Sequence, residues 1–120
     1  MNVVVIGASD KPDRYSYQAV MLLKEKGHSV FSVHQRIKEI EGMKVYSSIK
    51  DVVDVVDTVT FYVAADISSK ITDDILTKKP RRIIFNPGAE NSELEGKAVK
   101  QGVICLNACT LVMLRTGQFG

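Results

Sequence analysis

NVVVIGASDKPDRYSY, residues 2–17, is the stretch that decides the fold. Its apolar, β-branched beginning predicts a buried strand that breaks at Gly7, and Tyr15 opens a segment with helical spacing. A strand that turns at a glycine into a helix is where many nucleotide-binding folds hold phosphate. The dinucleotide fingerprint has three glycines in this turn, whereas this loop has one. The loop therefore indicates a phosphate-type site without specifying the ligand.

Short apolar runs of the same kind recur along the chain. They predict strands at 2–7, 29–34, 58–64, 82–88 and 103–108, with a weaker strand at 43–46. Helical spacing falls between them, at 15–26, 67–79, 92–101 and from Cys109 to about Gly117, with a short helix within 47–56. Asp66, Asn91 and Ser48 stand where N-caps are expected.

Strand and helix thus alternate through residues 1–120, which predicts a single domain of the α/β class with a doubly wound parallel sheet. With the 43–46 strand counted third, the expected spatial order is 3-2-1-4-5-6, with that short strand at the edge. The length of 120 residues suits one hydrophobic core.

Composition limits the classes of ligand. The formal net charge of +2 is too small to indicate a nucleic-acid binder. No apolar run approaches the ~18 residues of a membrane helix, and no secretory signal is visible, so a cytoplasmic protein is expected. Cys105 and Cys109 are then reduced thiols. Their spacing, with only His28 and His34 elsewhere, does not indicate a metal site.

In a doubly wound sheet, ligands bind at the carboxyl ends of the strands. The residues just past those ends are small, polar or glycine: Gly7, Ala8 and Ser9; His34, Gln35 and Arg36; Val63 and Ala64; Asn86, Pro87 and Gly88; Asn107, Ala108 and Cys109. Small residues let a ligand approach backbone N–H groups closely. Lys11 and Arg14 add positive charge beside the first loop, unless they are simply solvated.

The second strand argues against NAD. An acid usually follows that strand and binds the ribose diol of NAD, but here no acid occurs before Glu39. Arg36 and Lys38 follow instead, and basic residues there suit an additional phosphate on the ribose. NADP carries such a phosphate on the 2′ position, and coenzyme A (CoA) carries one on the 3′ position.

The sequence resembles the small stand-alone CoA-binding proteins in five segments that occur in the same order. These segments are VVVIGAS, GHSVFSVHQRIKEIEGMKVYSSI, VDTVTFYV, RIIFNPGAEN and ACTLVML. These proteins are similar to the N-terminal CoA-binding domain of the succinyl-CoA synthetase α subunit, and the resemblance covers nearly all of the chain. It implies a Rossmann-like fold with CoA across the carboxyl edge of the sheet. Gly7, Ala8 and Ser9 would approach the phosphates, with Lys11, Arg14 and Ser16 nearby. The resemblance also implies that Val33, His34, Gln35 and Arg36 lie beside the nucleotide and that Lys38 reaches a phosphate. Val63 and Ala64 would border the adenine or the pantetheine arm. Pro87 and Gly88 would close the other side of the site.

The chain departs from that family at the end of the second strand. The family usually has an asparagine-proline pair there, whereas this chain has His34-Gln35. Proline fixes φ and stiffens a loop, so its loss alters what holds the loop in place. His34 could donate to a phosphate, more so when protonated.

No complete catalytic motif is visible in the sequence. His34 could act as a general base, Cys109 as a nucleophile at a helix start and Glu90 as an acid, but each also has a non-catalytic interpretation. The sequence therefore favours a module that binds CoA or an acyl-CoA and is not an enzyme. Two alternatives stay open, an NADP-type oxidoreductase fragment and a nucleotide fold that has lost its ligand. The sequence does not specify a protein partner.

Overall fold

A seven-stranded sheet forms the centre of the computed structural model, which describes residues 1–120. The strands are β1 (Asn2–Ile6), β2 (Ser29–Val33), β3 (Glu39–Ile40), β4 (Met43–Tyr46), β5 (Thr58–Phe61), β6 (Arg82–Phe85) and β7 (Ile104–Asn107). Their order is β3-β4-β2-β1-β5-β6-β7, and every pair except β3 with β4 is parallel. The doubly wound sheet and the relative order of the six predicted strands are confirmed, but the prediction that the 43–46 strand lies at the edge is wrong, because β3 pairs antiparallel on its outer side.

β3 is the strand that the sequence did not predict. It pairs antiparallel with β4, and Glu41 and Gly42 form the two-residue turn between them. Both turn residues have positive φ, 48° and 78°, as a tight hairpin turn requires. A strand of two residues is too short to show an alternation of apolar and polar side chains, so the pattern gave no signal.

Helices connect the parallel strands. They are α1 (Tyr15–Glu25), α2 (Ala65–Ser68), α3 (Thr72–Thr77), α4 (Ser92–Lys100) and α5 (Thr110–Arg115), with single 3₁₀ turns η1 (Ile49–Asp51) and η2 (Ser69–Ile71). The predicted helix at 67–79 is wrong in its start and its continuity, because α2 begins at Ala65 and η2 separates it from α3. Asp66 is accordingly not the N-cap but lies in the first turn.

Two of the predicted caps are confirmed. The N–H of Leu94 donates to Oδ1 of Asn91 at 3.0 Å and begins α4. The N–H of Lys50 donates to Oγ of Ser48 at 3.1 Å, although the element there is only the three-residue η1. The chain after η1 must return along the sheet to begin β5, and an extended segment covers ~3.3 Å per residue against ~1.5 Å for a helix. This distance explains why residues 52–56 are not helical.

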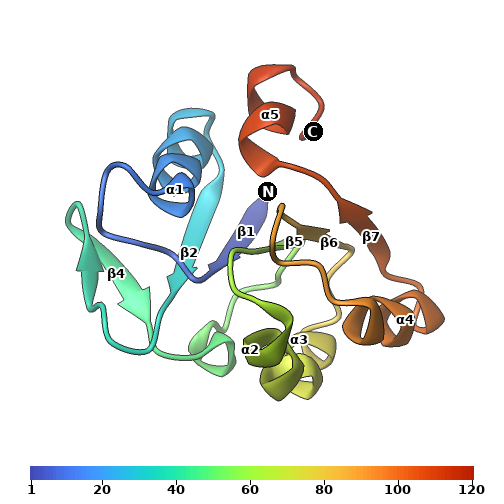
Figure 1. The fold of residues 1–120 in the computed structure, drawn as a ribbon. Coiled ribbons are helices and arrows are strands. Elements are labelled where there is room, and N and C mark those ends of the chain that lie inside the picture. Colours follow the sequence, from blue (N-terminus) through green and yellow to red (C-terminus); the bar gives the residue numbers. More distant parts are fainter.

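The helices form a layer on each face of the sheet, as Figure 1 shows. α1 and α5 cover one face, and α2, α3 and α4 cover the other. Side chains of β1 alternate between the two layers: Val3 and Val5 pack with α1 and α5, whereas Val4 and Ile6 join the opposite core. Both faces are therefore filled, and the loops at the ends of the strands are the places left for a ligand.

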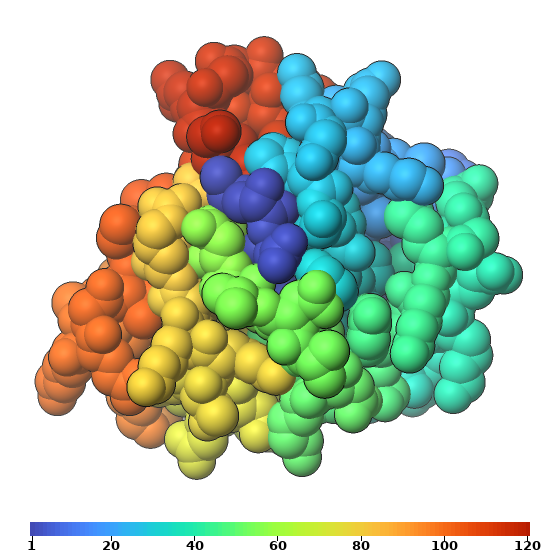
Figure 2. Space-filling model, turned by 180° about the vertical axis from the view of Figure 1, so that it is seen from behind, coloured from blue at the N-terminus to red at the C-terminus, as the bar shows by residue number.

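The amino edge of the sheet is closed by the two ends of the chain. In Figure 2 the blue N-terminal residues lie between the cyan end of α1, the green segment before β5 and the red C-terminal residues. Arg82 is buried there, and its guanidinium donates to Oγ1 of Thr58 at 3.1 Å and to the carbonyl of Phe119 at 2.8 Å.

A buried polar network fixes the opposite, carboxyl edge. The side-chain amide of Asn86 donates to Oγ1 of Thr60 at 2.7 Å and to the carbonyl of Phe61 at 2.8 Å. Its Oδ1 accepts the N–H of Thr110 at 2.8 Å, and the hydroxyls of Thr60 and Thr110 are 2.8 Å apart. One side chain that is 3% exposed thus holds β5, β6 and α5 together.

Replacing Asn86 by alanine is expected to remove three hydrogen bonds and to leave the buried N–H of Thr110 without its acceptor, which costs roughly 1–3 kcal/mol of the free energy of unfolding. Asn107→Ala is the matched control, because Asn107 is exposed at the end of β7 and its change should stay within about 0.5 kcal/mol. Urea unfolding of both variants measures the difference, and equal stabilities would contradict the role given to Asn86.

His28 at the amino edge predicts a pH dependence of stability. Burial lowers the pKa of His28 below its ordinary value of 6.5, the N-terminal ammonium and Arg82 lower it further, and Asp57 opposes them. Below pH 6.5 the unfolded chain takes up the proton more readily than the folded one, so the free energy of unfolding falls as the pH decreases through that value. Urea unfolding measures the free energy of unfolding at about pH 8 and about pH 5.5, and its decrease between the two is expected to be smaller for His28→Gln than for the wild type. An equal decrease in the two proteins would contradict this assignment.

Candidate functional site

Two adjoining cavities open at the carboxyl edge. The first, here the β1 cavity, has a volume of about 520 Å³ and is lined by Gly7, Ala8, Ser9, Asp10, Lys11, Arg14, Ser16, His34, Arg36, Ile37, Tyr62 and Val63. The second, here the β4 cavity, has a volume of about 500 Å³ and is lined by His34, Gln35, Ile37, Lys38, Lys44, Val45, Tyr46, Ser47 and Asp51. His34 and Ile37 line both, so the loop after β2 forms the wall between them.

Most of the residues predicted from the sequence line one of these cavities. Nine lie in the β1 cavity: Gly7, Ala8, Ser9, Lys11, Arg14, Ser16, His34, Arg36 and Val63. Gln35 and Lys38 line the β4 cavity, and Val33 is buried at the end of β2. Ala64, Pro87 and Gly88 line neither cavity. Sequence reasoning missed Lys44 and Tyr46, whose only signal was the weak strand that carries them.

Gly7 makes the turn at the end of β1 possible. Its φ is +86°, and a Cβ atom there would lie 2.7 Å from Cγ1 of Val63 and 3.2 Å from the carbonyl of Tyr62. Its N–H donates to the carbonyl of Val33 at 3.0 Å. The chain after β1 is therefore held against the ends of both neighbouring strands, which only a glycine permits.

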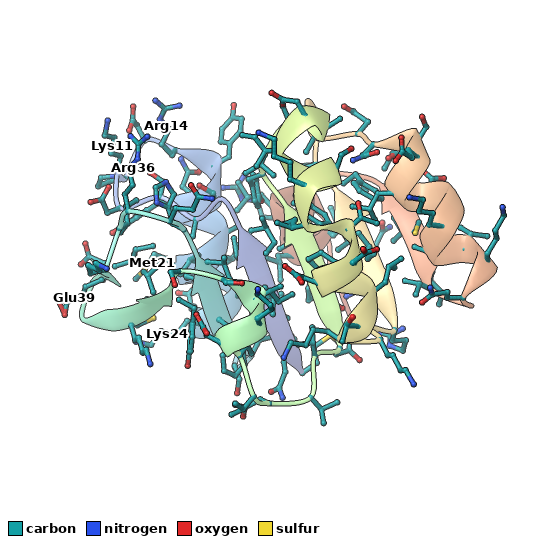
Figure 3. The ribbon with its side chains drawn as sticks, turned by 90° about the horizontal axis from the view of Figure 1, so that it is seen from below. Lys11, Arg14, Met21, Lys24, Arg36 and Glu39 are labelled. Carbon is teal, nitrogen blue, oxygen red and sulfur yellow. The ribbon has the colours of Figure 1, made fainter.

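The loop from Gly7 to α1 carries free positive charge. The hydroxyl of Ser9 accepts the N–H of Lys11 at 3.1 Å, and the N–H of Arg14 donates to the carbonyl of Lys11 at 3.0 Å. These bonds fix the backbone, while the side chains of Lys11, Arg14 and Arg36 form no ion pair. Figure 3 shows these three cations together at one corner of the molecule, where the loops after β1 and β2 meet. Such a corner suits an anion with several negative oxygens.

His34 holds the loop after β2. Its backbone N–H donates to the carbonyl of Tyr46 at 2.9 Å. Its ring Nδ1 accepts two backbone N–H groups, that of Arg36 at 3.0 Å and that of Ile37 at 3.1 Å. Because Nδ1 is an acceptor, the neutral ring carries its proton on Nε2.

The β4 cavity combines an aromatic ring with positive charge. Nζ of Lys44 lies 4.7 Å from the ring centroid of Tyr46, and the ring of Phe31 lies 6.1 Å from it on centroids. Asp51 accepts the hydroxyl of Ser47 at 3.2 Å. This arrangement can hold a flat ring and an adjacent anionic group.

Of the three side chains considered for catalysis in the sequence, His34 lines both cavities, whereas Cys109, at the start of α5, lines neither. Burial, with the charge of Glu95, raises the pKa of Cys105 to about 11, so this thiol is protonated at neutral pH. Burial also raises the pKa of Tyr62, whose hydroxyl has no hydrogen-bond partner. Glu90 lines neither cavity and accepts the N–H of Gly88 at 3.0 Å. No group of three or more histidine, cysteine or acidic side chains is placed to bind a metal, and none of the helices has the length and apolar character needed to span a bilayer.

Comparison with known proteins finds similarity to CoA-binding proteins over most of the chain. The sequence pattern of the family described as CoA binding domain matches residues 1–115. The α subunit of the ADP-forming acetate–CoA ligase II of Pyrococcus furiosus is 39% identical over 56 residues, which are 46% of this chain and 12% of that subunit.

Two solved structures extend the comparison. An uncharacterized protein with 37% sequence identity superposes with a TM-score of 0.93 and covers 98% of this chain and 97% of its own. The dinucleotide forming acetyl-coenzyme A synthetase 1 of Ca. Korarchaeum cryptofilum, solved with phosphate and ADP, has 25% identity and a TM-score of 0.73. It covers 89% of this chain but only 25% of its own, so this chain corresponds to a small part of that enzyme.

Replacing Gly7 by alanine is expected to destabilise the protein. The left-handed backbone alone costs about 1–2 kcal/mol for a residue with a side chain, and the methyl group would also press on Val63 and Tyr62. Gly96→Ala is the control, because Gly96 lies in α4 with open space around it, and alanine in a helix should stabilise by about 0.5–1 kcal/mol. Thermal unfolding that ranks the two variants the other way would contradict the role of Gly7.

Proposed function

The chain belongs to the CoA binding domain family, and from this premise we propose that it binds CoA or an acyl-CoA and performs no catalysis of its own. The observation that carries the proposal is the β1 cavity, where Lys11, Arg14 and Arg36 meet over the turn at Gly7 without forming an ion pair, although Asp10 also lines the cavity. CoA offers a pyrophosphate and a ribose 3′-phosphate, and such groups match unpaired cations.

We assign the pyrophosphate to the β1 cavity. The small side chains of Ala8 and Ser9 leave the backbone accessible, and Ser16 marks the first turn of α1, whose free N–H groups favour negative charge. Arg14 and Arg36 line the same cavity and can form charge-assisted hydrogen bonds with phosphate oxygens. Lys11 contributes a more mobile charge.

We assign the adenosine end of CoA to the β4 cavity. Tyr46 offers a ring face, and Lys38 and Lys44 offer two cations for the 3′-phosphate. The loop of His34 and Ile37 separates this cavity from the pyrophosphate, as the ribose separates the two phosphate groups within CoA. The pantetheine arm would then leave past Val63, toward the middle of the sheet edge.

An NADP-type ligand is the second candidate, because a 2′-phosphate would also find Lys38 and Lys44. CoA is favoured by the family match and by the relatives named as CoA ligases and synthetases. The absence of catalysis is supported by Cys109 and Glu90, which line neither cavity, and by the ring of His34, whose Nδ1 is already hydrogen-bonded.

Calorimetric titration of the purified protein with CoA, dephospho-CoA, NADP and NAD tests the proposal. CoA is expected to bind with a dissociation constant of about 1 μM or lower, a free energy of about −8 kcal/mol, and more tightly than NADP. Tighter binding of NADP would transfer the proposal to the second candidate, and no binding of either would favour a fold that has lost its ligand.

The assignment of the two phosphate positions makes its own prediction. Lys38→Ala should weaken CoA and leave dephospho-CoA unchanged, because only CoA has the 3′-phosphate. Arg14→Ala should weaken both ligands by a similar factor, worth about 1.5–3 kcal/mol when the contact is desolvated and much less when it is solvated. Lys24→Ala, on the exposed side of α1 and away from the three cations in Figure 3, is the charge-matched control and should change neither. If Arg14→Ala alone removed the preference for CoA, the two assignments would have to be exchanged.

A further inference from the structure

One ring nitrogen of His34 fixes the turn after β2, which separates the two cavities. Nδ1 of His34 accepts the N–H groups of Arg36 and Ile37, two and three residues further along the chain. This turn directs Arg36 toward the β1 cavity and is followed by Lys38 at the β4 cavity. The position of Arg36 therefore depends on one acceptor atom, whereas Lys38 is also held through its carbonyl, which accepts the N–H of Val45 at 3.0 Å.

The hydrogen bonds of His34 are those that an asparagine would make. In both side chains the accepting atom is bonded to Cγ, so Oδ1 of asparagine and Nδ1 of histidine reach the same backbone N–H groups. His34 thus offers the same acceptor as the asparagine that the resemblance to the stand-alone CoA-binding proteins leads one to expect at this position. The difference is that an amide oxygen accepts at any pH, whereas Nδ1 accepts only while the imidazole is neutral.

We propose that His34 is the positioning residue of the CoA site and that protonation of its ring releases the loop and weakens binding. The proposal rests on the function proposed above. When the ring is protonated, Nδ1 becomes a donor and faces two N–H donors at 3.0 and 3.1 Å. The turn then opens, and Arg36 loses its fixed position.

If protonation of His34 acted only by adding a positive charge to the site, acidification would strengthen the binding of CoA instead of weakening it. The charged and titratable groups that line the two cavities together with His34 are the cations Lys11, Arg14, Arg36, Lys38 and Lys44, the acids Asp10 and Asp51, and the phenols of Tyr46 and Tyr62. If His34 acted as a charged donor to phosphate, acidification would strengthen binding, whereas release of the turn weakens it. The direction of the change therefore distinguishes the two roles.

The experiment titrates CoA into the wild type, His34→Asn and His34→Ala at about pH 8 and about pH 5.5. At the higher pH, His34→Asn is expected to bind like the wild type, and His34→Ala about tenfold more weakly, as the loss of two hydrogen bonds predicts. At the lower pH, the wild type should lose about tenfold more affinity than His34→Asn. The comparison with asparagine removes the contribution of the phosphates of CoA, which also take up protons. His28→Gln is the control for the other histidine and should behave as the wild type.

A second measurement needs no ligand. The amide resonances of Arg36 and Ile37 are expected to shift with the same midpoint as the ring protons of His34 in the wild type, and to stay constant in His34→Asn. The proposal is overturned if these amides do not follow the ring, if His34→Asn keeps the pH dependence of the wild type, or if affinity rises on acidification. If the wild type binds no CoA at about pH 8 while the amides still follow the ring, the proposed function fails and the pH-sensitive turn stands.

Discussion

The contact between the turn at Gly7 and the end of β5 is the constraint on which the site depends. β1 is the strand where the order of the sheet reverses, with β2 on one side and β5 on the other. The N–H of Gly7 binds the carbonyl of Val33 on β2, while its Cα packs against Tyr62 and Val63 after β5. The chain can then enter α1 without covering the strand ends, and a crevice is left where the connections diverge. A side chain at this position would separate β1 from β5 and fill that crevice.

How far the sequence predicts this structure depends on the range of the interactions involved. The central strands are predictable because a strand buried on both faces must be apolar throughout, and VVVI and RIIF have no other simple interpretation. The N-cap at Asn91 is predictable because it is local. The hairpin of β3, the interruption by η2 and the extended return after η1 depend on where the sheet lies, so local pattern does not reveal them. Glu39, for example, is a strand residue only because Lys44 lies opposite.

In the candidate site, too, the features that follow from local sequence were predictable and those that depend on distant contacts were not. Gly7, Ser9 and Arg14 were identifiable because they follow the first strand directly, and they do line a cavity. Pro87 and Gly88 follow a strand as well, yet they line neither cavity, because the side chain of Asn86 turns inward to bind β5 and α5. The residue type of His34 suggested a donor to phosphate, a prediction that concerns Nε2; what the sequence did not reveal is that Nδ1 accepts two backbone N–H groups. That role depends on the position of two N–H groups, which a sequence pattern does not contain.

Proline and hydrogen-bonded histidine stiffen a loop in different ways, and the difference bears on function. Proline restricts φ in the folded and the unfolded chain alike, so its effect comes largely from the lower entropy of the unfolded state and cannot be switched. The two bonds to Nδ1 of His34 exist only in the folded protein and depend on one lone pair. A loop held by that lone pair can be as well ordered as one held by proline while the ring is neutral. It also responds to a proton, and because the same loop lines both cavities, a local change at one atom reaches both ends of a bound nucleotide.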